Sequence, residues 1–226
     1  MQAPNFSSAI EKLAEAYGKP NPPAITDPFE MVLHENVAYL VNDEHRTTAF
    51  ENLKTVIGTR PEDILNATPE QFAKVRELAG SDKKGRIQKL IRSAEIVRDH
   101  FGGDLKQVFS LPFRQARAAL MKFPSIGEPG AEKILMYNRV APVLALDSNG
   151  LRVLVRVGYT HEQHNYSVMY PAAQRSVADE QQHPFDPTAA YQLLRQHGQT
   201  ICRRTDPQCN MCAIRTMCDY GRQTSK

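Results

Sequence analysis

The sequence predicts an all-α protein, and three observations support this prediction. Apolar residues recur at helical spacing in several windows, whereas the alternation of apolar and polar residues that marks half-buried strands is scarce. Helix-start signals and glycines bracket these windows. The chain has 226 residues, of which 41% are apolar, so it can bury a sizeable core in one large domain or two small ones.

The first two helices come before and after a proline-rich stretch. The first is expected at about residues 6–17, and residues 19–28 read as an extended connector at which the chain can cross between domains. The next helix is expected to bury a stripe of apolar residues at helical spacing, namely Phe29, Val32, Leu33, Val37 and Leu40.

Two further helices have clear ends. Thr68 can cap a helix that continues to about Ala79, because Pro69 suits the first helical position and Gln71 completes a capping box. The following helix begins near Lys83 and is expected to stop at residues 102–103, where paired glycines tolerate left-handed backbone angles.

Residues 120–135 predict two helices joined by a tight turn. The turn runs from Ser125 to Gly127, and the second helix is expected to bury Ala131, Ile134 and Leu135. Such a turn exposes backbone N–H groups beside a helix N-terminus, which favours a phosphate oxygen. An ordinary connection between helices is the alternative.

A short apolar run at residues 142–146 leads into Asp147, and Leu151 and Leu154 mark another helix after it. Asp147 is therefore expected to cap that helix. Most capping aspartates do nothing else. The same geometry nevertheless holds a carboxylate ionised, as stabilisation of a developing positive charge requires.

All four cysteines fall in the last 25 residues of the chain, after a helix expected to end near residue 201. Their spacing suits a metal site, which could hold zinc or a four-iron cluster, and unligated thiols are a third alternative. The residues are Cys202, Cys209, Cys212 and Cys218.

Charge and hydropathy restrict the class of protein only loosely. The net charge of +3 is compatible with nucleic acid but too small to argue for it. No secretory signal or membrane-spanning apolar run is visible, so we expect a cytoplasmic protein without disulfides. A basic run forms either a solvated face or part of a DNA-binding surface, and consists of Lys83, Lys84, Arg86, Lys89 and Arg92.

The hairpin, the aspartate about twenty residues after it and the cysteine spacing together resemble the endonuclease III branch of the helix-hairpin-helix DNA glycosylases. The resemblance implies a six-helix barrel domain at residues 28–141. It also implies a second domain, formed by residues 1–27 and 142–226, that carries a 4Fe-4S cluster on the four cysteines. Such a protein is expected to act as a monomer on double-stranded DNA containing a lesion or mismatch, with the target nucleotide flipped out.

Carried over by position, Asp147 matches the catalytic aspartate of that family. Pro129 stands where bifunctional members have the lysine that forms a Schiff base with the sugar, so the resemblance implies a monofunctional, water-using glycosylase. Lys133, one helical turn further on, is a poorer substitute for that lysine. A catalytically degenerate DNA-binding protein with a structural cluster is the alternative.

The resemblance also implies DNA contacts. The hairpin would contribute Ser125, Gly127 and Gly130, with Lys122 before the turn and Arg203 and Arg204 beside the cluster. Leu40, with Tyr39 beside it, falls where relatives carry a glutamine that fills the gap left by the flipped base, although Leu40 could instead face the core. The candidate base pocket comprises His34, Glu35 and Asn36.

Overall fold

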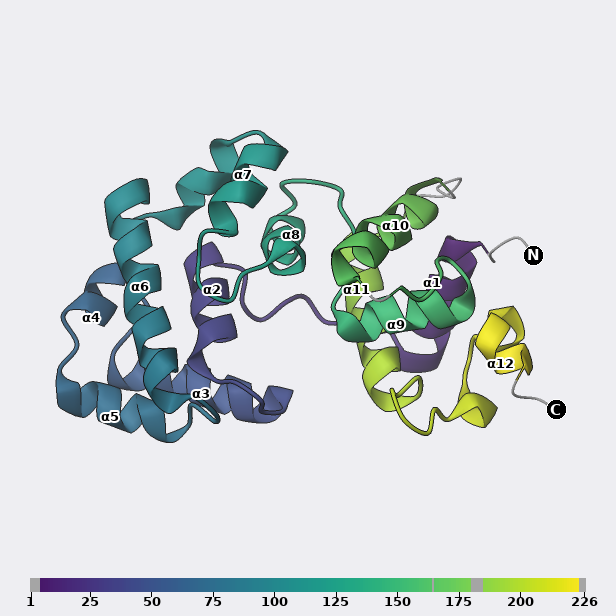
Figure 1. Ribbon diagram of the computed structural model, residues 1–226, viewed down its shortest axis with the longest axis horizontal. Coiled ribbons are helices and arrows are strands. Elements are labelled where there is room, and N and C mark those ends of the chain that lie inside the picture. Colours follow the sequence, from purple (N-terminus) through teal and green to yellow (C-terminus); the bar gives the residue numbers. More distant parts are fainter. Residues whose placement is uncertain (1–4, 164, 180–184, 224–226) are drawn as a thin grey trace. The chain divides into compact units, whose positions relative to one another are not determined.

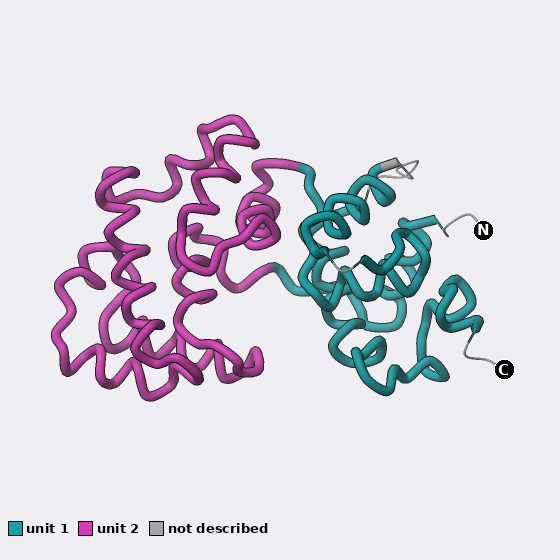
Figure 2. The backbone as a smooth tube through the Cα atoms, in the orientation of Figure 1, with its two compact units in different colours: residues 1–22, 142–226 teal, residues 23–141 magenta. Residues whose placement is uncertain are grey.

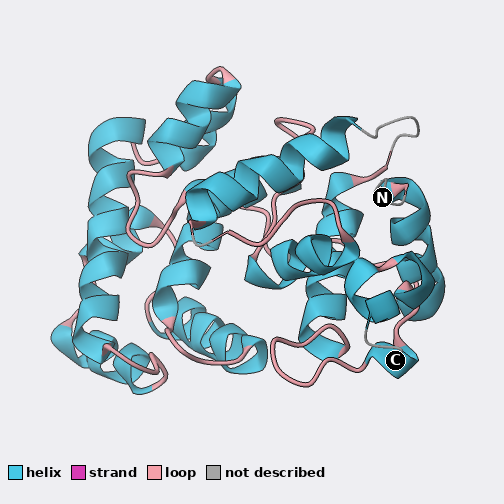
Figure 3. Ribbon diagram, turned by 45° about the vertical axis from the view of Figure 1, so that its right-hand side comes forward, coloured by secondary structure: helices cyan, strands magenta, loops and turns pink. Residues whose placement is uncertain are grey.

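The computed structural model describes residues 5–163, 165–179 and 185–223. These residues form twelve α-helices and three short 3-10 helices, with one isolated β-bridge and no β-strand (Figures 1 and 3). The predicted all-α class is therefore confirmed. Among the described residues, no helix is both long and apolar enough to cross a membrane.

Contacts divide the chain into two compact units (Figure 2). Unit 1 consists of Met1–Pro22 and Pro142–Lys226, and unit 2 consists of Pro23–Ala141. The first crossing lies inside the proline-rich connector, five residues before the expected domain boundary at residue 28. Each crossing falls next to a proline, whose fixed φ favours extended chain over helix.

Unit 2 is built around its longest helix, which packs against three other α-helices and one 3-10 helix of the same unit. Its apolar core includes Leu33, Phe50, Leu53 and Leu90, all fully buried. The helices are α2 (Pro28–Val37), α3 (Asp43–Val56), α4 (Pro61–Leu65), α5 (Pro69–Glu77), the long α6 (Lys83–Phe101), η1 (Leu105–Ser110), α7 (Phe113–Leu120) and α8 (Glu128–Tyr137).

The predicted helix ends in unit 2 are confirmed at α5 and α6. The Gln71 backbone N–H donates to Thr68 Oγ1, and the Thr68 N–H donates to Gln71 Oε1, which is a complete capping box. Helix α6 ends at Gly102, whose φ of +55° is left-handed.

Helix α2 ends earlier than its apolar spacing suggested. Its last residue is Val37, so Leu40 lies beyond the helix with a φ of +55° and a relative exposure of 74%. The expectation that Leu40 continues the buried stripe with Phe29 and Leu33 is wrong. The helical spacing of apolar residues continues to position 40, although the helix itself has already ended at Val37.

Unit 1 contains α1 (Phe6–Tyr17), α9 (Ser148–Val157), α10 (Tyr166–Asp179), α11 (Pro187–Thr200), η2 (Cys209–Met211), η3 (Arg215–Met217) and α12 (Asp219–Gln223). Helix α11 packs against both α9 and α1. Gly198 permits the close approach to α9, because a Cβ at this position would lie 2.7 Å from the Asn149 carbonyl oxygen. The expected helix at residues 6–17 is confirmed.

Candidate functional sites

The hairpin joins α7 to α8 in unit 2 through an exposed turn. Ser125 has a φ of +60°, a left-handed conformation that usually selects glycine, and its side chain is exposed. Gly127 is the N-cap of α8, and Ala131, Ile134 and Leu135 are buried as expected. From α6, Lys89 Nζ donates a hydrogen bond to Ser125 Oγ at 3.2 Å.

The two hairpin helices are tied together by charge. Arg117 of α7 forms ion pairs with Glu128 at 2.6 Å and with the buried Glu132 at 2.7 Å, both on α8. Pro129 lies in the first turn of α8, where its missing N–H costs no helical hydrogen bond. Because residue 129 is a proline, its side chain carries no amine.

Lys133 of α8 forms an ion pair with Glu35 of α2, and Arg46 of α3 pairs with the same carboxylate at 3.0 Å. Burial raises the pKa of Glu35, but the charge and hydrogen bond of Lys133 and the charge of Arg46 outweigh burial and lower this pKa to about 2. Glu35 is therefore ionised at neutral pH, and Lys133 is held beside a negative charge that favours its protonated form.

The neighbours of Glu35 differ in their exposure. The half-buried His34 meets the ring of Phe50 edge to face at 5.5 Å, and burial lowers the pKa of His34. Asn36 is fully buried, and its Nδ2 donates to the carbonyl oxygens of Val32 and Pro124. Asn36 thus ties α2 to the hairpin instead of facing an open surface.

The loop after α2 is fixed to the loop before α6. The Tyr39 N–H donates to the Ala79 carbonyl oxygen at 3.1 Å, and the Ser81 N–H donates to the Tyr39 carbonyl oxygen at 3.0 Å. Gly80 makes this possible, because a Cβ there would collide with the Tyr39 carbonyl oxygen. These two hydrogen bonds therefore fix the backbone next to position 40.

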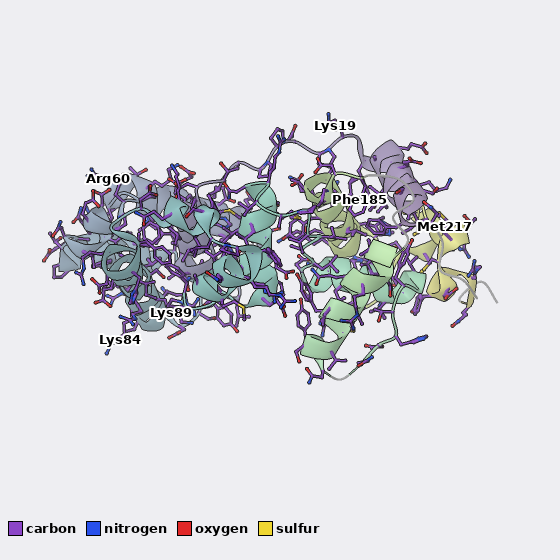
Figure 4. All side chains as sticks on the ribbon, turned by 90° about the horizontal axis from the view of Figure 1, so that it is seen from above. Lys19, Arg60, Lys84, Lys89, Phe185 and Met217 are labelled. Atoms are coloured by element: carbon purple, nitrogen blue, oxygen red, sulfur yellow. The ribbon has the colours of Figure 1, made fainter. Side chains whose placement is uncertain are left out.

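Tyr39 and Leu40 are two of the exposed large apolar residues in the described chain, at 47% and 74%. The guanidinium of Arg86 lies over the Tyr39 ring, 5.0 Å from its centroid. Arg86 itself is buried, so its assignment to a solvated basic face is wrong: Tyr39 covers it. Lys84 and Lys89 lie along one side of unit 2, with Lys84 pointing away from the body (Figure 4).

Asp147 is the N-cap of α9 in unit 1, as predicted. Its Oδ1 accepts hydrogen bonds from the N–H groups of Asn149 at 2.9 Å and Gly150 at 2.8 Å. Its Oδ2 accepts from Asn149 Nδ2 at 3.2 Å and forms an ion pair with Arg195 Nε at 3.1 Å. The side chain keeps 24% of its exposure, so a fixed, negatively charged carboxylate remains accessible.

The four cysteines line one pocket of unit 1, together with Val153, Arg156, His197 and Ile214. Among the described residues, no three His, Cys, Asp or Glu side chains are placed to hold a single metal ion. The loop carrying Arg203 and Arg204 is held by Arg156, which donates to both of their carbonyl oxygens, at 2.7 and 3.0 Å.

Nitrogen groups lie near three of the four cysteine sulfurs. Arg156 Nη1 donates to Cys202 Sγ at 3.4 Å, and the Gly221 N–H donates to Cys218 Sγ at 3.4 Å. His197 Nε2 lies 3.5 Å from Cys212 Sγ. Burial raises the pKa of Cys212 to about 11 and lowers the pKa of His197 to about 4. Metal binding would therefore have to displace the Cys212 proton.

No family model matches the chain. Among curated proteins, it is 22% identical to endonuclease III of Thermotoga maritima over 219 residues, which cover 96% of this chain and 95% of the relative. It is 28% identical to an adenine DNA glycosylase of Buchnera aphidicola over 171 residues, or 75% of this chain and 42% of that protein.

Solved structures show the same fold. A trapped covalent intermediate of endonuclease III with DNA superposes with a TM-score of 0.76 at 16% identity, over 98% of this chain and 97% of that one. In fold, and in sequence over nearly its whole length, this chain is similar to endonuclease III. A thermostable thymine-DNA glycosylase gives a TM-score of 0.75 at 20% identity, over 96% of this chain and 95% of the other.

Unit 2 of this chain holds the hairpin, the Leu40 loop and the Glu35 cluster, whereas unit 1 holds Asp147 and the cysteines. Sequence reasoning missed Arg46, Arg117 and Arg195, which neutralise the carboxylates of these sites. No local pattern marks them, because each partner lies on a different helix.

Proposed function

We propose that this protein is a DNA base-excision glycosylase that hydrolyses the N-glycosidic bond of a flipped damaged or mismatched base without forming a Schiff base. One observation carries the proposal: an accessible carboxylate is fixed at Asp147. By the resemblance stated above, Pro129 in the first turn of α8 stands where bifunctional relatives have the Schiff-base lysine. The carboxylate suits cleavage of the bond to the base, and the proline removes the amine needed for the lyase step.

Asp147 would stabilise positive charge on the sugar as the base departs. Two N–H groups at the start of α9, the Asn149 amide and Arg195 hold the carboxylate in place, so it need not reorganise as charge develops. It would also orient or activate the attacking water.

The side chains on α8 support a monofunctional mechanism. Pro129 offers no amine, and Lys133 is committed to Glu35, whose negative charge keeps the ammonium protonated. A Schiff base requires a neutral amine aimed at the sugar carbon, and a protonated lysine one ~5 Å turn away does not provide it.

The proposed DNA contacts lie at exposed positions of both units. In unit 2 the turn offers Ser125 and the N–H groups near Gly127 and Gly130, and Lys122 is exposed beside it. In unit 1 the exposed Arg203 and Arg204 would contact phosphates. These contacts position the duplex and carry no sequence information.

Leu40 and Tyr39 would fill the gap that the flipped base leaves in the duplex. Leu40 projects from a braced loop in a left-handed conformation that disfavours leucine by about 1–2 kcal/mol. An exposed apolar side chain held at such a cost is expected where function uses it. Insertion of an apolar wedge between bases is one such use.

The four cysteines would hold a 4Fe-4S cluster. A zinc ion draws its thiolates to about 2.3 Å from one point, whereas a cubane cluster is held by thiolates arranged around a larger body. Four cysteine side chains that line one pocket, with N–H donors to two of the sulfurs and a histidine nitrogen beside a third, fit the cluster. When bound, the group would tie the C-terminal loop to α9 and α11.

The test is base release from duplex oligonucleotides carrying uracil, a thymine mismatch, oxidised pyrimidines, adenine opposite oxidised guanine, or alkylated purines. Alkali then converts each abasic site into a strand break. We expect release from at least one duplex by the wild-type protein and loss of release in Asp147→Asn. If no duplex loses a base while both proteins bind DNA equally, the chain is the catalytically degenerate binding protein instead.

A further inference from the structure

His197 connects the N-terminal helix of unit 1 to the cysteine pocket. It lies on α11, is 1% exposed, and has a partner at each ring nitrogen. The Tyr17 hydroxyl, at the last residue of α1, lies 2.6 Å from His197 Nδ1. On the other side of the ring, Nε2 lies 3.5 Å from Cys212 Sγ.

The two partners of the ring allow its single proton to lie on either nitrogen. A neutral imidazole carries one N–H, and burial disfavours the charged form with two. If the Tyr17 hydroxyl donates to Nδ1, that nitrogen is the acceptor and the proton lies on Nε2. The N–H of Nε2 then points at the Cys212 sulfur, which accepts it once it is a thiolate.

The donors at the other sulfurs behave differently. Arg156 and the Gly221 backbone N–H can only donate, so their hydrogen bonds to Cys202 and Cys218 need no second group. His197 can donate or accept at Nε2, and a Tyr17 hydroxyl that donates to Nδ1 favours donation from Nε2. A phenylalanine at position 17 would keep the ring contact, with centroids 5.9 Å apart, but lose this control.

We propose that Tyr17 and His197 form a relay that fixes an N–H···S hydrogen bond to Cys212 and thereby raises the reduction potential of the bound cluster. A hydrogen bond to a ligating thiolate draws electron density from the sulfur and stabilises the more negative, reduced state. Tyr17 and His197 are positioning residues in this account, and neither ligates the metal. The inference rests on the cluster assigned above.

The experiment compares the cluster-loaded wild-type protein with Tyr17→Phe. The readouts are the reduction potential by voltammetry and the iron–thiolate stretching bands by resonance Raman spectroscopy. We expect Tyr17→Phe to lower the potential and shift the bands, with iron and sulfide content unchanged. Tyr166→Phe is the matched control, because it also removes a hydroxyl from unit 1, one that donates to the Leu146 carbonyl oxygen.

A second variant separates the relay from general damage. The amide of His197→Gln can donate to the sulfur without any tautomer choice, so adding Tyr17→Phe to it is expected to cause no further shift. Equal potentials in wild type and Tyr17→Phe would overturn the relay alone. A wild-type protein without iron would overturn the relay together with the cluster assignment, while base release would still report on the glycosylase proposal.

Discussion

The Lys133 ammonium on α8 forms an ion pair with the Glu35 carboxylate on α2, although 98 residues separate them in the sequence. This ion pair restricts the chemistry that is open to Lys133. Its amine is held in an ion pair with a carboxylate whose pKa is lowered to about 2, and which is therefore charged at neutral pH. Lys133 is therefore a structural cation and a poor replacement for the missing amine at position 129.

Pro129→Lys is expected to introduce lyase activity. The substitution places an amine in the first turn of α8, where lysine can replace a proline without losing a helical hydrogen bond. Borohydride should then trap a covalent protein–DNA adduct that the wild-type protein does not form. Adduct formation by the wild type, abolished in Lys133→Arg, would show instead that Lys133 is the nucleophile.

Asp147→Asn is expected to reduce base release by about a hundredfold or more while leaving DNA binding intact. Asparagine caps helices nearly as well as aspartate, so the free energy of unfolding should change by less than about 1 kcal/mol. Single-turnover kinetics and denaturant titration measure the two effects. Asp186→Asn, at the N-cap of α11, is the matched control and should retain activity. If Asp147→Asn released bases as fast as the wild-type protein, Asp147 would have no role in the mechanism.

Leu40→Asn is expected to increase stability and decrease base excision. Asparagine tolerates the left-handed conformation at position 40, so the free energy of unfolding should rise by about 1 kcal/mol. Loss of the wedge should slow excision by about tenfold, which corresponds to ~1.4 kcal/mol. Leu40→Ala should slow excision equally without the gain in stability. Unchanged excision in both variants would mean that Leu40 does not enter the duplex.

Glu35→Gln is expected to destabilise the protein in a pH-dependent way. The folded-state pKa of Glu35 is depressed to about 2 from an ordinary value near 4.5. Its stabilisation is therefore complete above pH 4.5 and is lost as the pH falls through about 2. We expect a cost of about 2–3 kcal/mol at pH 7, because the substitution leaves Lys133 and Arg46 without their partly buried partner.

Urea unfolding at several pH values measures this cost. The difference between wild type and Glu35→Gln should shrink below pH 4.5. The exposed pair of Arg98 and Asp99 provides the control, and Asp99→Asn should have little effect at any pH. A Glu35→Gln cost that is independent of pH would mean that lost packing, and not lost charge, causes it.

Local signals were sufficient for much of the fold. The capping box at Thr68, the glycine stop at Gly102 and the cap at Asp147 each depend on residues within one turn, and each was predicted correctly. The alternative in which Leu40 faces the core is wrong, because the apolar spacing continues after the helix has ended at Val37. Whether a residue after a helix is buried depends on where the chain turns.

The contacts that define the sites were not predictable in the same way. Tyr17 and His197 lie 180 residues apart, and the buried Arg86 of α6 lies against the ring of Tyr39, which comes from the loop after α2. Such pairs arise from packing between helices, which no single window of sequence records. The sequence identified Asp147 and Pro129 as important positions, while the structure supplied the partners that restrict Asp147 and Lys133.

The most direct test of the central proposal is to count abasic sites and strand breaks on one duplex that the wild-type protein processes. Base release is measured after alkali, and strand cleavage is measured on an untreated sample from the same reaction. We predict that abasic sites accumulate while strands stay intact until alkali is added. Strand cleavage that keeps pace with base release in the absence of alkali would contradict the account.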